Sequence, residues 1–208
     1  MEKFILDTNI FFNMAPGVGL GKKTEEVVKK LTGLIPQLKG RAEFYMPPRI
    51  VDEFLSFFEN KNQPFIKDFL SAVIIKSPTV ATNNFPASVF YRLVDEIRQR
   101  SYRGLALGEE EIKKAGQLLT GKESLSKKDF EMTIGPVVKN FRERYRQATR
   151  VGFLDSLADL DLIVLAKELN GTLITTDEGI IVWARLFGVK EMPAEVWQRR
   201  LDSLLHQE

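Results

Sequence analysis

The order of apolar and polar positions divides most of the chain into short buried strands separated by amphipathic helices. Continuous apolar runs are typical of strands buried on both faces, and they occur at 4–6, 44–46 and 73–75. The segment 172–176, which is rich in β-branched residues, is predicted to be a further strand. Apolar residues at helical spacing predict helices over 24–38, 49–60, 64–70, 155–169, 179–187 and 193–205. Strands that alternate with helices predict an α/β fold with a central parallel sheet flanked by helices.

The pattern changes between about residues 79 and 150, where strand-like runs vanish. Apolar residues recur there at helical spacing, and Gly104, Gly108 and Gly121 divide the segment. We expect Pro136 at the start of its last helix, because proline is favoured in the first helical turn. A stretch of roughly 70 residues is too long for an ordinary loop. We therefore predict one domain built from 1–78 and 147–208, and an all-helical insertion over 79–146.

The composition narrows the available chemistry. The chain of 208 residues has no cysteine, and its single histidine, His206, lies in the polar carboxyl-terminal segment. These counts argue against thiolate metal sites, cysteine nucleophiles, serine triads and histidine acid–base catalysis. No apolar run reaches the roughly 18 residues of a membrane span, and the first apolar stretch is too short for a signal peptide. We expect a cytoplasmic protein that does not bind membranes.

Charge is unevenly distributed, although the net charge is only +2. Residues 79–150 contain 14 Lys and Arg against 9 Asp and Glu, so the rest of the chain carries a net charge of −3. Four cations recur at i, i+3, i+7 and i+11, close to one helical stripe: Lys139, Arg142, Arg146 and Arg150. Such a stripe is either a solvated helix face or a surface that positions RNA phosphates. A basic insertion and an acidic domain together favour a nucleic-acid partner.

Acidic residues follow the apolar runs. Asp7 comes after strand 4–6, Asp177 comes after strand 172–176, and Asp155, Asp159 and Asp161 stand at the start of helix 155–169. Ligands of open α/β sheets bind at the carboxyl ends of the strands, so these carboxylates are expected to converge. Crowded negative charges need a cation, and Mg²⁺ and Mn²⁺ prefer carboxylate oxygens. The sequence therefore predicts a metal site.

Other interpretations of these acids remain open. Asp7 and Asp177 are each in a position to cap a helix. Asp161 lies about 200° round a helix from Asp159 and fits the same site poorly. Glu53, on the helix after the second strand, is either a further site residue or a surface acid.

Several motifs resemble those of PIN-domain ribonucleases: the segment Leu6-Asp7-Thr8-Asn9, the Asp155, Asp159 and Asp161 cluster, and the segment 173–177 ending in Asp177. More narrowly, the run YRQATRVGFLDSLADLD at 145–161 resembles the HARP family, the homologs of Aquifex RNase P. The segment FYMPP at 44–48 and Asp177 with the downstream Trp183-Ala184 share this resemblance. Some members of that family are also labelled RNA ligase partner proteins. The resemblance covers nearly the whole chain, including the central helical insertion.

The resemblance implies a PIN-like domain and a protein-only ribonuclease P, a metal-dependent endoribonuclease that cuts precursor tRNA to leave the mature 5′ end with a 5′-phosphate. It implies catalytic roles for Asp7, Asp155, Asp159 and Asp177, with Asp161 joining them at the metal. The cofactor would be Mg²⁺, with Mn²⁺ as a substitute. It also implies dimers that form through the insertion and assemble further, while the basic stripe of the insertion favours RNA contacts there.

Two alternatives remain from the sequence. One is a toxin-type PIN ribonuclease with another RNA target. The other is a non-catalytic RNA-binding or ligase-accessory protein.

Overall fold

The computed structural model describes residues 1–12, 21, 23–79, 81, 84–150, 152–154 and 156–206. The chain divides into two compact units. The first unit comprises Met1–Pro86 and Leu154–Glu208, and the second comprises Ala87–Phe153. The second unit thus begins and ends later in the sequence than the predicted range 79–146.

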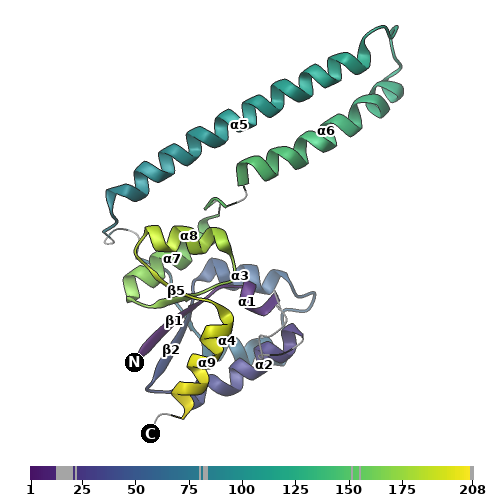
Figure 1. Cartoon of the computed structure of the whole chain (residues 1–208). Helices are drawn as coiled ribbons and strands as arrows, with labels where there is room; N and C mark the ends of the chain where they lie inside the picture. Colours follow the sequence, from purple (N-terminus) through teal and green to yellow (C-terminus); the bar gives the residue numbers. More distant parts are fainter. Residues whose placement is uncertain are drawn as a thin grey trace. The chain divides into compact units, whose positions relative to one another are not determined.

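The first unit contains a parallel sheet of five strands in the order β3-β2-β1-β4-β5 (Figure 1). The strands are β1 (Glu2–Leu6), β2 (Ala42–Met46), β3 (Ile74–Ile75), β4 (Thr172–Ile174) and β5 (Lys190–Met192). The predicted α/β fold with a central parallel sheet is confirmed. Leu6 is level with Ile174, so the two central strands β1 and β4 end side by side. The sequence did not indicate β5, because this short strand is only partly buried and has Lys190 and Glu191 among its three residues.

Helices lie on both sides of this sheet, with α7 and α8 on one side and α2 and α9 on the other (Figure 1). The helices of the first unit are α1 (Asn9–Phe12), α2 (Thr24–Leu34), the short 3₁₀ helix η1 (Ile35–Leu38), α3 (Pro48–Ser56), α4 (Pro64–Ala72), α7 (Leu157–Leu169), α8 (Glu178–Leu186) and α9 (Ala194–Leu205). Proline occupies the first position of α3 and of α4, where its missing N–H costs nothing. The Ser156 side chain caps α7, so that helix begins at Leu157 and not at residue 155 as expected.

The core of the first unit is apolar and rich in aromatic rings. Phe4 of β1 and Phe44 of β2 contact the Trp197 ring of α9, with centroids 6.0 and 6.4 Å apart. All three side chains are buried. Burial of such rings is the main favourable contribution to folding, and here it fixes α9 across the strands that end at the acidic edge.

The second unit is a hairpin of two long helices, α5 (Ala87–Leu119) and α6 (Lys127–Arg150), which lie side by side (Figure 1). Gly104 and Gly108 lie inside α5 and do not divide it, contrary to the expectation from the sequence. Pro136 likewise lies inside α6 and not at its start. The actual start is marked by Ser126, whose Oγ accepts a hydrogen bond from the Asp129 N–H at 3.2 Å.

Polar contacts hold this hairpin together. Arg144 of α6 donates hydrogen bonds to Glu111 at 2.5 Å and to Glu110 at 2.8 Å, both on α5. Gly104 lies against Tyr145, where an added Cβ would come within 2.8 Å of the ring. Within α6, whose residues are all described, none is buried.

No helix in the described part of the chain is long and apolar enough to span a membrane.

Candidate active site

Asp7 stands directly after β1 and is 2% exposed. Its backbone N–H donates to the Ile174 carbonyl at 3.1 Å, which continues the pairing of β1 with β4. Its carboxylate accepts hydrogen bonds from the Thr175 hydroxyl at 2.5 Å and the Asn9 amide at 3.1 Å, and the Thr8 hydroxyl oxygen lies 3.3 Å from Asp7 Oδ1. Burial raises the pKa of Asp7, and the hydrogen bonds from Thr175 and Asn9 oppose the shift. The carboxylate is therefore fixed in position but costly to keep charged.

Asp177 stands at the first residue of the turn into α8 and caps that helix. Its Oδ1 accepts a hydrogen bond from the Ile180 N–H at 3.1 Å, so the capping role considered from the sequence is present. Its own N–H donates to the Thr175 hydroxyl at 3.0 Å. Thr175 thereby connects Asp177 to Asp7, because the same hydroxyl donates to Asp7. One threonine thus sets the positions of two strand-end acids.

Asp159 lies in the first turn of α7, where its N–H donates to the Ser156 hydroxyl at 3.0 Å. Burial raises the pKa of Asp159 to about 6. The hydrogen bond with Ser156 opposes this shift, whereas the charges of Asp7, Asp177 and Glu53 add to it. Three other acids are therefore close enough to disfavour the charged form of Asp159.

Glu53 of α3 belongs to this group, although the sequence left its role open. The Thr8 hydroxyl donates to Glu53 Oε1 at 3.0 Å and lies 3.3 Å from Asp7 Oδ1. The charge of Glu53 raises the pKa of both Asp7 and Asp159. Helical periodicity could not identify this residue, because its contact joins positions 45 residues apart in the chain. We call Asp7, Glu53, Asp159 and Asp177 the acid cluster.

Asp161 forms an ion pair with an arginine side chain. Its Oδ2 lies 2.6 Å from Nη1 of Arg49, the second residue of α3. The sequence predicted that Asp161 would fit the site of Asp159 poorly, because the two residues lie about 200° apart around the helix. The contact of Asp161 with Arg49 agrees with that expectation.

Asp155 lies outside the described residues. In the described part of the chain, no group of three or more His, Cys, Asp or Glu side chains lies close enough together to hold one metal ion.

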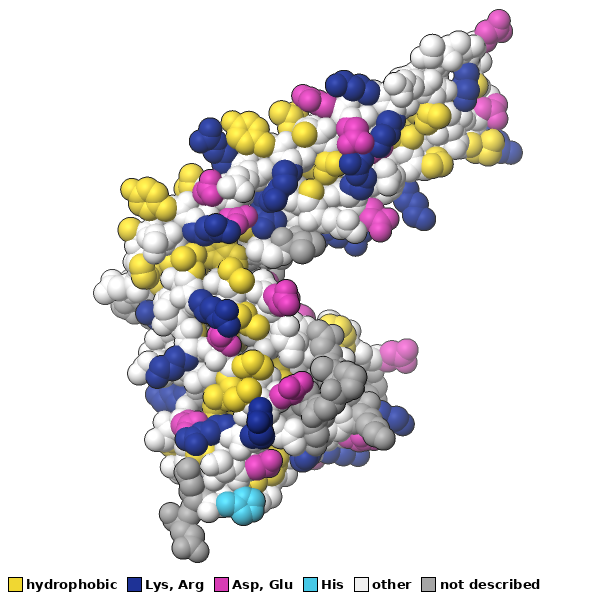
Figure 2. All heavy atoms as spheres, in the orientation of Figure 1, with side chains coloured by type: hydrophobic (Ala, Val, Ile, Leu, Met, Phe, Trp, Pro, Cys, Tyr) yellow, Lys and Arg dark blue, Asp and Glu magenta, His cyan; other side chains and the backbone are white. Residues whose placement is uncertain are grey.

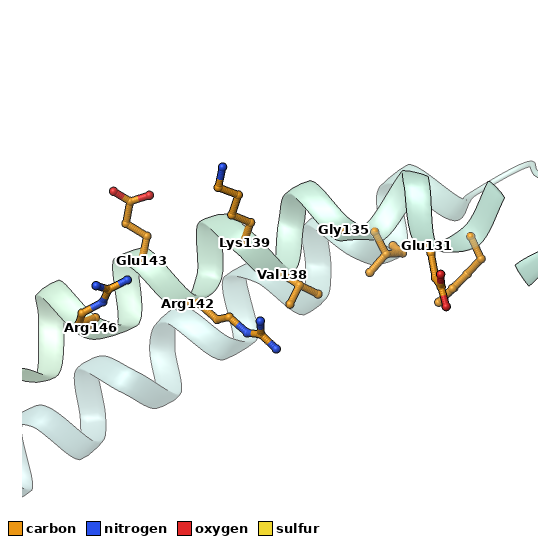
Figure 3. Close-up of a pocket in the computed structure, with 9 residues that line it drawn as sticks. Glu131, Gly135, Val138, Lys139, Arg142, Glu143 and Arg146 are labelled. Carbon is orange, nitrogen blue, oxygen red and sulfur yellow. The ribbon is translucent and has the colours of Figure 1, made fainter. Parts of the chain in front are cut away.

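The four basic residues singled out in the sequence all lie on α6, in the second unit. Lys139, Arg142 and Arg146 line a surface hollow of about 590 Å³. The stripe is less regular than the spacing suggested, because Arg142 points away from Lys139 and Glu143 (Figure 3). Glu143 and Glu131 also line the hollow, so the cations are interrupted by acids.

A five-stranded parallel sheet with acids gathered at the carboxyl ends of its central strands is typical of metal-dependent nucleases of the PIN class. A family model described as PINc domain ribonuclease matches residues 3–206. The chain therefore belongs to the PIN-domain ribonucleases, and the resemblance noted in the sequence is confirmed. Enzymes of this class generally depend on divalent metal ions.

The chain is also similar, along most of its length, to curated proteins that share one name. The chain is 35% identical over 204 residues to an RNA-free ribonuclease P of Thermococcus onnurineus, an alignment that covers 98% of this chain and 95% of the relative. It is 34% identical over 206 residues to the protein of the same name from Pyrococcus horikoshii, covering 99% and 94%. It is also 34% identical over 191 residues to that of Halorhodospira halophila, covering 91% and 84%.

Proposed function

We propose that this chain is a protein-only ribonuclease P, which hydrolyses precursor tRNA at one phosphodiester bond to leave the mature 5′ end. The observation that carries the proposal is the acid cluster, found in a chain that aligns along nearly its whole length with RNA-free ribonucleases P. The acids support the proposed reaction, hydrolysis of a phosphodiester. The full-length similarity to ribonucleases P supports precursor tRNA as the substrate.

The chemistry of the donor set suits a hard divalent cation, and one proposed ligand, Asp155, lies outside the described residues. The proposed ligands are Asp7, Asp155, Asp159 and Asp177, with Asp161 as an associated acid, and their carboxylate oxygens suit Mg²⁺ with Mn²⁺ as a substitute. Burial, together with repulsion by neighbouring acids, raises the pKa of Asp7 and of Asp159 and makes their charged forms costly. A bound divalent cation would offset that repulsion and lower the pKa of a water molecule.

The chain's own residues then have distinct tasks. Thr175, Asn9 and Thr8 hold the Asp7 carboxylate in one orientation. Asp177 is held by its cap on α8, and Asp159 is held by Ser156 at the start of α7. Asp7 and Asp177 are the proposed direct ligands, while Asp155 and Asp159 complete the site or orient the attacking water. The expected products carry a 5′-phosphate and a 3′-hydroxyl.

The second unit is proposed to position the RNA. Lys139, Arg142, Arg146 and Arg150 on α6 are the proposed phosphate contacts. Contacts to phosphates fix the register of a folded RNA without reading its sequence, which suits recognition of tRNA by shape. Such binding should weaken steeply with added salt.

Assembly through the helical hairpin is supported by an apolar face on α5. Five side chains that are at least half exposed recur within one helical stripe: Phe90, Val94, Ile97, Leu105 and Ile112. Hydrophobic side chains are visible on the surface of the hairpin in Figure 2. Exposed apolar stripes of this length mark interaction sites, and we propose a second copy of the chain as the partner, giving dimers that assemble further.

The proposal is tested by incubating the purified full chain with Mg²⁺ and either of two RNAs. One is a precursor tRNA, and the other is an unstructured RNA that contains the same leader and the same nucleotides around the cleavage site. We expect one cut in the precursor at the mature 5′ end, no cut in the unstructured RNA, and no reaction in excess chelator.

The alternatives give different results. Equal cleavage of both RNAs would indicate a PIN ribonuclease with another target. Binding of the precursor without any cleavage would indicate an RNA-binding or ligase-accessory protein, and either result would overturn the proposal.

A further inference from the structure

Asp161, so far only an associated acid of the proposed site, forms an ion pair with Arg49, a residue that has no task in the proposed reaction. Arg49 Nη1 lies 2.6 Å from Asp161 Oδ2. The Asp161 side chain is 12% exposed, whereas the Arg49 side chain is 54% exposed. The carboxylate is thus the buried anchor, and the guanidinium it holds reaches solvent.

Both partners are close in the chain to members of the acid cluster. Arg49 precedes Glu53 by four residues on α3, which places them on the same helix face, about 6 Å apart along the axis. Asp161 follows Asp159 by two residues on α7. Arg49 is therefore on the same helix face as one acid of the cluster, and its ion-pair partner belongs to the same helix as another.

The guanidinium has unused donors. With described residues, Arg49 makes its ion pair through Nη1, and no further hydrogen bond of its side chain is formed. A guanidinium carries five N–H donors in a planar fork, which matches the oxygens of a phosphate. Nη2 and Nε thus remain available to an anion that approaches from solvent.

A cation is needed at this place, because the acid cluster repels an RNA backbone. A divalent ion held by the carboxylates would supply positive charge at the scissile phosphate only, whereas the phosphates on either side would face the negative charges of the acids. An arginine fixed by a buried carboxylate meets that need with little loss of side-chain entropy.

We propose that Arg49 binds a backbone phosphate adjacent to the scissile one, and that Asp161 is a positioning residue that holds Arg49 in place. This inference rests on the proposed ribonuclease activity. It gives Asp161 a task other than the metal ligation expected from the resemblance.

The test combines protein variants with altered RNA under single-turnover conditions, using the full chain, Mg²⁺ and precursor tRNA. Arg49→Ala and Arg49→Lys are compared with the control Arg185→Ala, which removes another surface arginine of the first unit. Arg185 is paired with Glu191 and lies in the last turn of α8, at the opposite end of that helix from Asp177. Each phosphate flanking the cleavage site is replaced singly by a neutral methylphosphonate. Thermal unfolding of each variant verifies that it is folded.

We expect Arg49→Ala to raise the half-saturating enzyme concentration about tenfold or more, the effect of losing a hydrogen bond to a charged group. Arg49→Lys should fall between the wild type and Arg49→Ala, and Arg185→Ala should match the wild type. At one flanking position the neutral phosphate should impair the wild type by a similar factor and leave Arg49→Ala no worse. Equal impairment of both proteins at every position would overturn the proposed contact.

The role of Asp161 is tested by its dependence on Arg49. Asp161→Asn should weaken cleavage in the wild type, add nothing in the Arg49→Ala variant, and leave the Mg²⁺ concentration for half-maximal activity unchanged. A higher Mg²⁺ requirement in both backgrounds would show that Asp161 ligates the metal and would overturn the positioning role. Absence of any precursor cleavage by the wild type would overturn the proposed function and this inference together, whereas normal cleavage by Arg49→Ala would overturn this inference alone.

Discussion

The two units of the chain distribute charge and apolar surface in opposite ways. The first unit buries aromatic rings such as Phe44 and Trp197 and gathers its acids at one edge of the sheet. The second unit buries the charged groups Glu96, Arg100 and Glu111, while apolar side chains of α5 face solvent. The first arrangement is that of a self-sufficient folding unit. The second is that of an element whose apolar face is completed by a partner, as we propose for the hairpin.

The largest expected effect is the difference in stability loss between removing a buried aromatic ring of the first unit and removing an exposed one of the second. Phe44→Ala should lower the free energy of unfolding of the first unit by about 3–5 kcal/mol, because it leaves a cavity beneath Trp197. Phe90→Ala should change it by less than about 0.5 kcal/mol. Both are measured by urea unfolding followed by tryptophan fluorescence, since Trp183 and Trp197, the only two tryptophans, lie in the first unit. Equal losses would show that the comparison between the units is wrong.

Charges placed on the apolar face of α5 test its role in assembly. Val94→Asp combined with Ile97→Asp should reduce the assembly to a smaller species, because burying unpaired carboxylates in an interface is costly. The first unit should keep its urea midpoint. Light scattering coupled to size-exclusion chromatography measures the mass, and Lys113→Asp, at an exposed polar position of α5, is the control. An unchanged mass would exclude this face as the interface.

Removing one acid from the cluster should stabilise the metal-free protein. Asp159→Asn should raise the free energy of unfolding by roughly 0.5–2 kcal/mol, because it removes a carboxylate whose charged form is disfavoured by burial and by the charges of Asp7, Asp177 and Glu53. Urea unfolding in the presence of a chelator measures this change, and the exposed Asp202→Asn on α9 serves as the control. A loss of stability would mean that the cluster is not strained by its charges.

The smallest expected effect concerns two glycines of α5. Gly108→Ala should stabilise the hairpin by about 0.5–1 kcal/mol, since alanine favours helix and nothing lies within 4 Å of the new methyl group. Gly104→Ala should give no such gain, because its methyl group would lie 2.8 Å from the Tyr145 ring. Amide hydrogen exchange in α5, measured in the Val94→Asp/Ile97→Asp background to remove assembly, compares the two. Equal gains would show that Tyr145 moves aside freely.

The sequence predicted the sheet well, because its buried strands are continuous apolar runs. Strands β1, β2 and β4 and helices α3, α4, α8 and α9 lie where the pattern placed them, within a few residues. Strand β5 was missed because it has little apolar character to indicate it. Glycine and proline misled in the second unit: Gly104 makes room for Tyr145, and Ser126, not Pro136, begins α6.

The candidate site was only partly predictable from the sequence. Asp7, Asp159 and Asp177 follow strand ends or begin a helix, so local sequence reveals them. Glu53 and Arg49 contact residues that are 45 and 112 positions away in the chain, and no periodicity reveals such pairs. Sequence reasoning did not single out Thr175. The feature that could have indicated it is its position just after β4 and two residues before Asp177. In the structure its hydroxyl contacts both Asp7 and Asp177.

The most direct test of the central claim compares two aspartates of the first unit in one cleavage assay. Asp7 belongs to the acid cluster, whereas Asp52 is exposed on α3 beside Glu53. With precursor tRNA and Mg²⁺ under single-turnover conditions, Asp7→Asn should cleave more than about 100-fold slower than the wild type, exceeding the loss from a merely orienting partner. Asp52→Asn should match the wild type, and the mapped product should begin at the mature 5′ end with a 5′-phosphate. Cleavage by Asp7→Asn at the wild-type rate would contradict the account.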